Sequence, residues 1–174
     1  MAVRLRTPLG EEDVLNLRAG DVVHLSGTVY TARDSAHRRI LELAARRELP
    51  FDLEGAVIYH CGPVVRKGGG GYEVVSAGPT TSARMNRYLE GILSLGVRGI
   101  IGKGGMNPGP FKGRAVYFAF TGGAGSLAAK SIKNVREVLW LDELGTPEAV
   151  WVLEVKDFPL LVAIDANGSS LYGR

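Results

Sequence analysis

The chain of 174 residues has one cysteine, Cys61. A single thiol excludes an intrachain disulfide framework and a metal centre built from several cysteines of this chain. The sequence also has no apolar run near the roughly 18 residues of a membrane-spanning helix, and its first residues lack the apolar core of a secretory signal peptide. We therefore expect a cytoplasmic protein that has no membrane partner.

The sequence also has no large excess of positive or negative side chains. Lysine and arginine number 21 against 18 aspartates and glutamates, which gives a formal net charge of +3. Nucleic-acid-binding domains carry clustered positive charge, whereas Arg38, Arg39, Arg46 and Arg47 have the spacing of a solvated helix face. Hydrophobic residues make up 45% and charged residues 22%, as in ordinary globular proteins. The length predicts one domain over residues 1–174.

Glycine is abundant, with 24 residues that cluster between structured segments. Apolar periodicity predicts helices from Asp34 to Leu49, from Thr80 or Thr81 to Leu95, and over residues 124–132, with Asp34 and one of the threonines as N-caps. It predicts strands over residues 22–30 (with a bulge at Gly27), 56–60, 99–102, 115–120, 135–141, 149–155 and 160–164, a hairpin over 64–75 and an extended segment over 1–20. Helices that alternate with short apolar strands favour an α/β fold with a mixed, largely parallel sheet.

Polar residues gather at five places where an apolar element ends. These segments are residues 31–37, 60–63, 76–84, 102–106 and 121–125. In an open α/β sheet, the loops at the carboxyl ends of the strands line the ligand crevice. We therefore expect most of these segments to converge on one site.

The chemistry of this expected site is cationic. Arg33, Arg84 and Lys103 lie near strand ends and glycine turns, and helix N-termini add backbone N–H donors. Because arginine binds carboxylate through two parallel hydrogen bonds, the set predicts a small ligand with one or two carboxylates. Structural alternatives stay open: a local ion pair between Arg33 and Asp34, and a simple tight turn over residues 102–105.

Two histidines and the cysteine also lie in these polar segments. His37 lies one helical turn after Arg33, where it can orient that residue or touch a ligand. His60 and Cys61 end a strand, and a lone cysteine is usually a small buried hydrophobe. Residues 100–105 also resemble the GXXG loop of KH nucleic-acid-binding domains. That loop needs a helix on both sides, which Pro108 and Pro110 oppose.

Five ordered motifs resemble those of a known enzyme family. Residues 31–37, 78–85, 102–106, 121–124 and 157–159 are similar to the C-terminal domain of class I, iron–sulfur-dependent fumarate hydratases. In many bacteria and archaea this domain is a separate β subunit, and the L-tartrate dehydratase β subunit is similar as well. The resemblance extends from about Gly20 to Tyr172.

The resemblance implies a fold, a reaction and a partner. The fold is the family's swivelling β/β/α domain, and the reaction is the reversible hydration of fumarate to L-malate, a step of the tricarboxylic acid cycle. A 4Fe-4S cluster acts as the Lewis acid and is held by three cysteines of an α subunit. We therefore expect a heteromer in which this hydro-lyase chain is inactive alone. Self-association of the isolated chain as a homodimer stays open.

The resemblance also implies residue roles. Arg33, Arg84 and Lys103 bind the substrate carboxylates, and Thr80 is the base at C3. Supporting positions are Asp34, His37, Thr81 and Gly104. A threonine hydroxyl is a very weak acid, so this role requires nearby cations or helix amides that stabilise the alkoxide.

The sequence departs from the family pattern in two places. Asn86 stands where we expect an acidic residue, and residues 107–111 form a shorter segment than usual. L-Tartrate carries one more hydroxyl than malate and needs a polar partner for it. The sequence identifies no such partner, so we favour fumarate over L-tartrate or another hydroxy acid.

Overall fold

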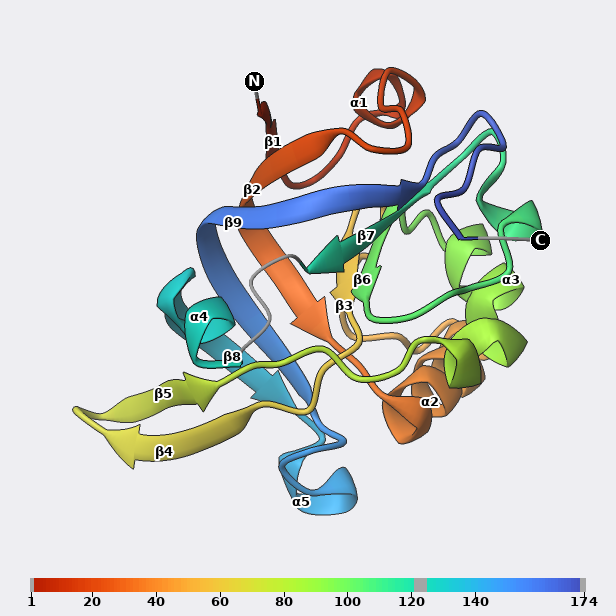
Figure 1. The fold of residues 1–174 in the computed structure, drawn as a ribbon. Coiled ribbons are helices and arrows are strands. Elements are labelled where there is room, and N and C mark those ends of the chain that lie inside the picture. The colour runs from red at the N-terminus through yellow and green to blue at the C-terminus, as the bar shows by residue number, and fades with distance from the viewer. Residues whose placement is uncertain (1, 121–124, 173–174) are drawn as a thin grey trace.

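The computed structural model describes residues 2–120 and 125–172, and its strands form one seven-stranded sheet and one two-stranded hairpin (Figure 1). The strands are β1 (Val3–Arg6), β2 (Val22–Thr31), β3 (Val57–Tyr59), β4 (Val64–Gly68), β5 (Gly71–Ser76), β6 (Gly99–Gly102), β7 (Val116–Phe120), β8 (Ile132–Leu139) and β9 (Val150–Ile164). The α-helices are α1 (Glu11–Leu15), α2 (Asp34–Ala45), α3 (Asn86–Ser94), α4 (Gly125–Lys130) and α5 (Leu141–Leu144). Short 3₁₀ helices are η1 (Ala83–Met85) and η2 (Gly109–Phe111).

The large sheet has the strand order β1-β2-β3-β6-β7-β9-β8. Neighbours from β1 to β7 run parallel, whereas β9 is antiparallel to β2, β7 and β8. In β9, Leu160 and Leu161 pair with β2 on one side and with β7 on the other, so β2, β3, β6, β7 and β9 close into a barrel-like ring. The predicted α/β class with a mixed sheet is confirmed.

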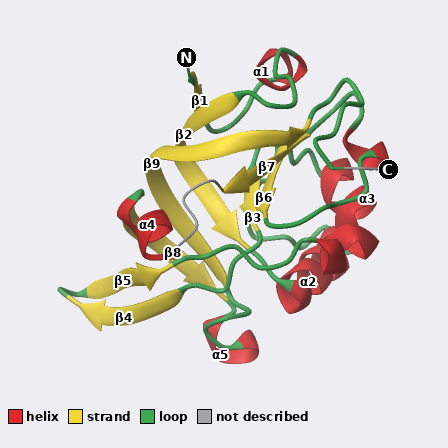
Figure 2. Cartoon of the chain, in the orientation of Figure 1, coloured by secondary structure: helices red, strands yellow, loops and turns green. Residues whose placement is uncertain are grey.

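The core has two parts because the inner strands are buried on both faces. Val57 and Tyr59 of β3 contribute to the cluster inside the ring, whereas Ile58 between them packs with the apolar faces of α2 and α3. Figure 2 shows these two helices together on one side of the sheet. This arrangement fixes the ends of β3 and β6 next to the start of both helices. In the described part of the chain, no helix is long and apolar enough to cross a membrane.

Several local predictions are confirmed. The glycine-tipped hairpin is formed by β4 and β5, which project from the body of the molecule (Figure 1). The bulge at Gly27 is present, because the register between β2 and β9 shifts between Leu25 and Gly27, and Gly27 has φ +109°. The buried stripe of the second predicted helix is also present in α3.

The predicted helix starts need correction. Arg33 is the N-cap of α2, and Asp34 is its first residue, with its carboxylate used elsewhere. Neither Thr80 nor Thr81 caps a helix, because the chain first forms η1 and α3 begins only at Asn86. The spacing of apolar residues locates the buried face of a helix, but it does not locate the turn that precedes the helix.

Other boundaries also differ. Residues 1–20 contain β1 and α1 instead of one extended segment, and α2 ends at Ala45, before Arg47 adopts φ 58°. The last two predicted strands are one continuous β9 that passes through Asp157 and Pro159. Asp157 takes a left-handed φ of 49°, which bends the strand without ending it.

Candidate active site

The loop over residues 76–84 joins the ends of β3 and β6 through its backbone. The Thr80 N–H donates to the His60 carbonyl at 2.8 Å, and the Ser82 N–H donates to the Lys103 carbonyl at 3.0 Å. Figure 1 shows this loop running from the β4–β5 hairpin to the start of α3. The predicted convergence of the second, third and fourth polar segments is therefore present.

The first segment joins the same site through a side-chain ion pair. Arg84 Nη2 lies 3.1 Å from Asp34 Oδ2, and it also lies 3.5 Å from Thr80 Oγ1. Burial pushes the pKa of the Asp34 carboxyl upward, but the hydrogen bond and charge of Arg84 outweigh it and hold that pKa below its usual value. Asp34 thus orients a guanidinium beside the Thr80 hydroxyl.

Arg33 has a different partner, which the sequence did not indicate. Its Nε lies 3.3 Å from Glu148 Oε2, while Glu148 Oε1 accepts the Ser35 N–H at 2.9 Å. The predicted local pair of Arg33 with Asp34 is therefore wrong. A Cβ on Gly62 would lie 2.9 Å from Arg33 Cδ, so a glycine is needed where this side chain crosses the backbone. Only the fold brings Glu148, just before β9, to the start of α2.

Lys103 is the third of the three cations. It is exposed at the end of β6, and within the described residues it forms no ion pair. Gly104 has φ +77° and its carbonyl accepts the Tyr117 hydroxyl at 2.7 Å, so the chain bends here in a backbone conformation that favours glycine. Because strand β6 precedes this loop, the arrangement lacks the first helix of a KH-type loop, and that alternative is wrong.

Two buried histidines lie beneath these loops. His37 Nδ1 lies 2.7 Å from the Arg33 carbonyl oxygen, and His60 Nδ1 lies 2.7 Å from Ser82 Oγ. Burial lowers the pKa of His37 to about 4 and moves the pKa of His60 well below its usual value. Both rings are neutral at pH 7, so His37 orients the Arg33 backbone and adds no positive charge.

The family follows from comparison with known proteins. The family model described as Fumarase C-terminus matches residues 1–174. The chain belongs to the Fumarase C-terminus family. The family resemblance drawn from the five sequence motifs is confirmed.

Relatives of this chain are named as a tartrate dehydratase subunit or as a fumarate hydratase. The chain is 47% identical over 173 residues to the L(+)-tartrate dehydratase subunit beta of Escherichia coli, covering 96% of this chain and 85% of that protein. It is 48% identical over 171 residues to a putative L(+)-tartrate dehydratase subunit beta of Methanocaldococcus jannaschii, covering 94% and 88%. It is 41% identical over 176 residues to a putative fumarate hydratase class I of Geobacillus stearothermophilus, covering 98% of this chain and 33% of that protein.

The single cysteine of this Fumarase C-terminus chain is too few for the three cysteine ligands that the family resemblance implies for the cluster. Cys61 is buried, and burial raises the pKa of its thiol to about 12. In the described ranges, no three His, Cys, Asp or Glu side chains group as metal ligands. Residues 2–120 and 125–172 therefore contain no grouped ligand set for that cluster.

The fifth polar segment is partly outside the described residues. Residues 121–124 fall there, but Gly125 follows them directly, and its carbonyl accepts the Ala77 N–H at 3.0 Å. A Cβ on Gly125 would clash with Ser76 Oγ, so the small residue allows this close approach. The described end of the fifth segment thus meets the loop that carries Thr80.

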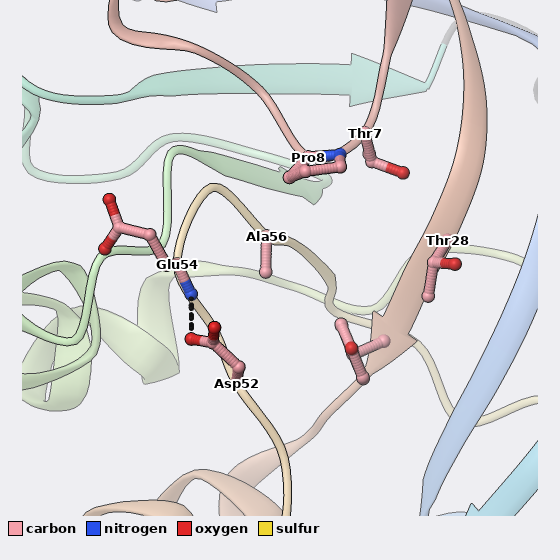
Figure 3. Close-up of a pocket in the computed structure, with 7 residues that line it drawn as sticks. Thr7, Pro8, Thr28, Asp52, Glu54 and Ala56 are labelled. Atoms are coloured by element: carbon pink, nitrogen blue, oxygen red, sulfur yellow. Dashed lines mark hydrogen bonds between the residues drawn. The ribbon is translucent and has the colours of Figure 1, made fainter.

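A separate pocket of about 240 Å³ lies away from these residues (Figure 3). Its lining contains Asp52, whose carboxylate accepts the Glu54 N–H at 2.9 Å, and Glu54, which pairs with Arg98 at 3.2 Å. The two carboxylates make this pocket unfavourable for a dicarboxylate anion. The candidate active site of this chain therefore remains at the loops that carry Arg33, Thr80, Arg84 and Lys103.

Proposed function

We propose that this chain is the β subunit of a class I fumarase-type hydro-lyase that adds water to a four-carbon dicarboxylate. The observation that carries the proposal is the guanidinium of Arg84, held by Asp34 and placed 3.5 Å from Thr80 Oγ1. Family membership supports the reaction class. We also propose that residues 1–174 form one domain of the swivelling β/β/α type, and a cytoplasmic location stays a prediction from the sequence.

The three cations are suited to bind the two substrate carboxylates. Lys103 is exposed and has three N–H donors to offer. Arg33 and Arg84 each face one carboxylate of the chain, at 3.3 and 3.1 Å. Because a guanidinium has five N–H donors, each arginine keeps donors for a substrate oxygen, while its partner carboxylate fixes the orientation.

Thr80 is proposed as the base that removes the C3 proton in the dehydration direction. To accept the C3 proton, Thr80 must first lose its own hydroxyl proton to solvent, and its alkoxide form is accessible only where nearby positive charge stabilises it. The Arg84 guanidinium at 3.5 Å supplies a fixed positive charge at that oxygen, which is the electrostatic arrangement that lowers barriers most effectively. In the hydration direction the same hydroxyl returns the proton to C3.

An α subunit is the proposed partner. Relatives of this chain are named subunit beta, and the chain has one cysteine, too few for the three cluster ligands that the resemblance implies. We therefore assign the 4Fe-4S cluster to the α subunit. A homodimer of the isolated chain is a secondary proposal, which light scattering of the purified chain tests.

Fumarate and L-malate are the first proposed substrate pair, and L-tartrate is the second candidate. The second rests on relatives named L(+)-tartrate dehydratase subunit beta at 47% and 48% identity. The additional hydroxyl of tartrate requires a polar group that pairs with it in the site.

The test is turnover of both substrates by the assembled subunits. The chain is mixed anaerobically with its reconstituted α subunit, and malate formed from fumarate and oxaloacetate formed from L-tartrate are measured. We expect the mixture to hydrate fumarate and the chain alone to be inactive. Turnover of L-tartrate alone would replace the substrate but keep the reaction class. Equal turnover by this chain without the α subunit would contradict the two-subunit proposal.

A further inference from the structure

His60 and Ser82 form a buried hydrogen-bonded pair beneath the loops that carry Thr80 and Lys103. His60 Nδ1 lies 2.7 Å from Ser82 Oγ, and the two residues are only 1% and 0% exposed. His60 directly follows β3, whereas Ser82 lies just before η1. The bond therefore joins two segments that meet only in the folded chain.

The backbones of the same two residues hold the proposed base and the proposed carboxylate-binding lysine. The His60 carbonyl accepts the Thr80 N–H at 2.8 Å, and the Ser82 N–H donates to the Lys103 carbonyl at 3.0 Å. The side-chain bond between His60 and Ser82 thus links the residue that holds the Thr80 backbone to the residue that holds the Lys103 backbone, alongside the bond from the His60 N–H to the Ile101 carbonyl at 2.8 Å.

Strand β6 makes room for the His60–Ser82 pair because it has a glycine at position 102. A Cβ on Gly102 would clash with Ser82 Oγ, and it would also lie 3.1 Å from the Tyr117 hydroxyl oxygen. Tyr117 in turn donates to the Gly104 carbonyl at 2.7 Å. The Ser82 hydroxyl therefore occupies a space that only glycine at 102 provides, directly under the lysine turn.

If position 60 had only a structural role, an apolar side chain would make the fold more stable than the imidazole of His60 does. Its Nε2 is buried and has no hydrogen-bond partner among the described residues. An unpaired buried polar atom lowers stability, and an apolar side chain would avoid that loss. Burial also keeps the pKa of His60 well below its usual value, so near pH 7 the ring is a neutral imidazole and not the imidazolium that general acid catalysis needs. What the ring offers is the hydrogen bond at Nδ1.

We propose that His60 and Ser82 are positioning residues, whose mutual hydrogen bond sets the separation of Thr80 and Lys103 across the substrate. This inference rests on the proposed hydro-lyase function. It predicts that breaking the bond impairs both the base and carboxylate binding, although neither side chain touches the substrate.

The kinetic test compares four variants assembled with the α subunit. Ser82→Ala and His60→Leu remove the bond, and His60→Asn keeps a hydrogen-bonding group near the Nδ1 position. Because small misplacement of a catalytic group costs up to about 100-fold in rate, we expect Ser82→Ala and His60→Leu to lower kcat by roughly 10- to 100-fold and to raise KM. His60→Asn should recover most of the kcat. Ile92→Val, a buried change in α3, should lower Tm by a few degrees with kcat unchanged.

A second measurement needs no activity. Amide hydrogen exchange by NMR in the isolated full chain should be faster at the Thr80 and Ser82 N–H groups in Ser82→Ala, and near the wild-type rate in His60→Asn. If the wild-type assembly turns over neither fumarate nor L-tartrate, the proposed function fails, and exchange alone decides whether the pair holds the two loops.

Three results would overturn the inference. Unchanged exchange at both amides in Ser82→Ala would show that the bond does not hold the loops. Wild-type kcat and KM in Ser82→Ala would show that the bond is irrelevant to turnover. Equal loss of kcat in His60→Asn and His60→Leu would give the imidazole itself a chemical role.

Discussion

Replacing Thr80 by alanine separates the chemistry of its hydroxyl from any structural role. Thr80 is half-buried, and its Oγ1 accepts one long hydrogen bond, 3.5 Å from Arg84 Nη2. It caps no helix, since η1 starts three residues later with Ser82 as its N-cap. The substitution therefore removes one weak contact from the folded state and the whole proposed base from the active site.

The two effects differ greatly in size. A hydrogen bond of ordinary geometry contributes about 0.5–1.5 kcal/mol to stability, and a long bond to an exposed guanidinium contributes less. For a domain of this size, about 1 kcal/mol corresponds to a Tm shift of roughly 2–4 °C. Loss of a positioned acid–base group lowers the rate by roughly 100- to 10,000-fold. We therefore expect a large fall in kcat with a small change in Tm.

The assay measures kcat, KM and Tm for Thr80→Ala, Thr80→Ser and Thr81→Ala, each assembled with the α subunit. Thr80→Ser keeps a hydroxyl and should retain most of the activity. Thr81 is the matched control, because its side chain is exposed and its backbone already pairs with Lys103. Thr81→Ala should therefore leave both kcat and Tm nearly unchanged.

A kcat for Thr80→Ala within tenfold of the wild type would contradict the role of Thr80 as the base. Equal losses of activity in Thr80→Ala and Thr81→Ala, in proportion to their losses of Tm, would contradict it too. In either case another residue is the base, and the α subunit is the first place to test.

Three further predictions concern binding, packing and pH. Lys103→Met and Arg33→Met should each lower kcat/KM by roughly 10- to 150-fold, since each loses a charge-assisted hydrogen bond to substrate; unchanged kinetics would place that residue outside the site. Gly102→Ala should destabilise the fold by about 1–3 kcal/mol through its clash with Ser82 Oγ, and adding Ser82→Gly should restore part of the Tm. In the folded chain the pKa of His37 is lowered to about 4 from 6.5, so its ring is neutral near pH 7. Below pH 6.5 the unfolded chain binds more protons than the folded chain, so the free energy of unfolding should fall by about 3 kcal/mol between pH 6.5 and 4. Tm measured across this range checks it, and a His37→Asn chain should show a flatter profile.

Much of the fold follows from local pattern. The β-branched run of β2, the glycine hairpin and the helical stripe Tyr88, Leu89, Ile92 and Leu93 could all be predicted, because burial imposes a period of two or 3.6 residues. The closure of the ring by β9 could not, since it depends on one strand bending at Asp157 and pairing with both β2 and β7. Nothing in the local sequence of β9 specifies both partners.

The candidate site was predictable where it lies on motifs. The cations Arg33, Arg84 and Lys103 follow from the convergence of polar residues at strand ends in such sheets, whereas the role of Thr80 follows only from the family resemblance. Their partners were missed or misassigned. Glu148 lies in no motif, and it reaches Arg33 only through the chain's return before β9. The carboxylate of Asp34 pairs with Arg84 across 50 positions instead of with its neighbour, which sequence spacing alone does not reveal.

The central claim is that this chain supplies essential residues to a shared hydro-lyase site. The most direct test titrates the wild-type chain, and separately the Thr80→Ala/Lys103→Met double variant, into a fixed amount of α subunit while fumarate hydration is measured. We predict that the wild-type chain raises the rate to a plateau. The double variant should leave the rate near zero and, when added first, should compete with the wild-type chain for the α subunit. Restoration of the same plateau by the double variant would contradict the claim.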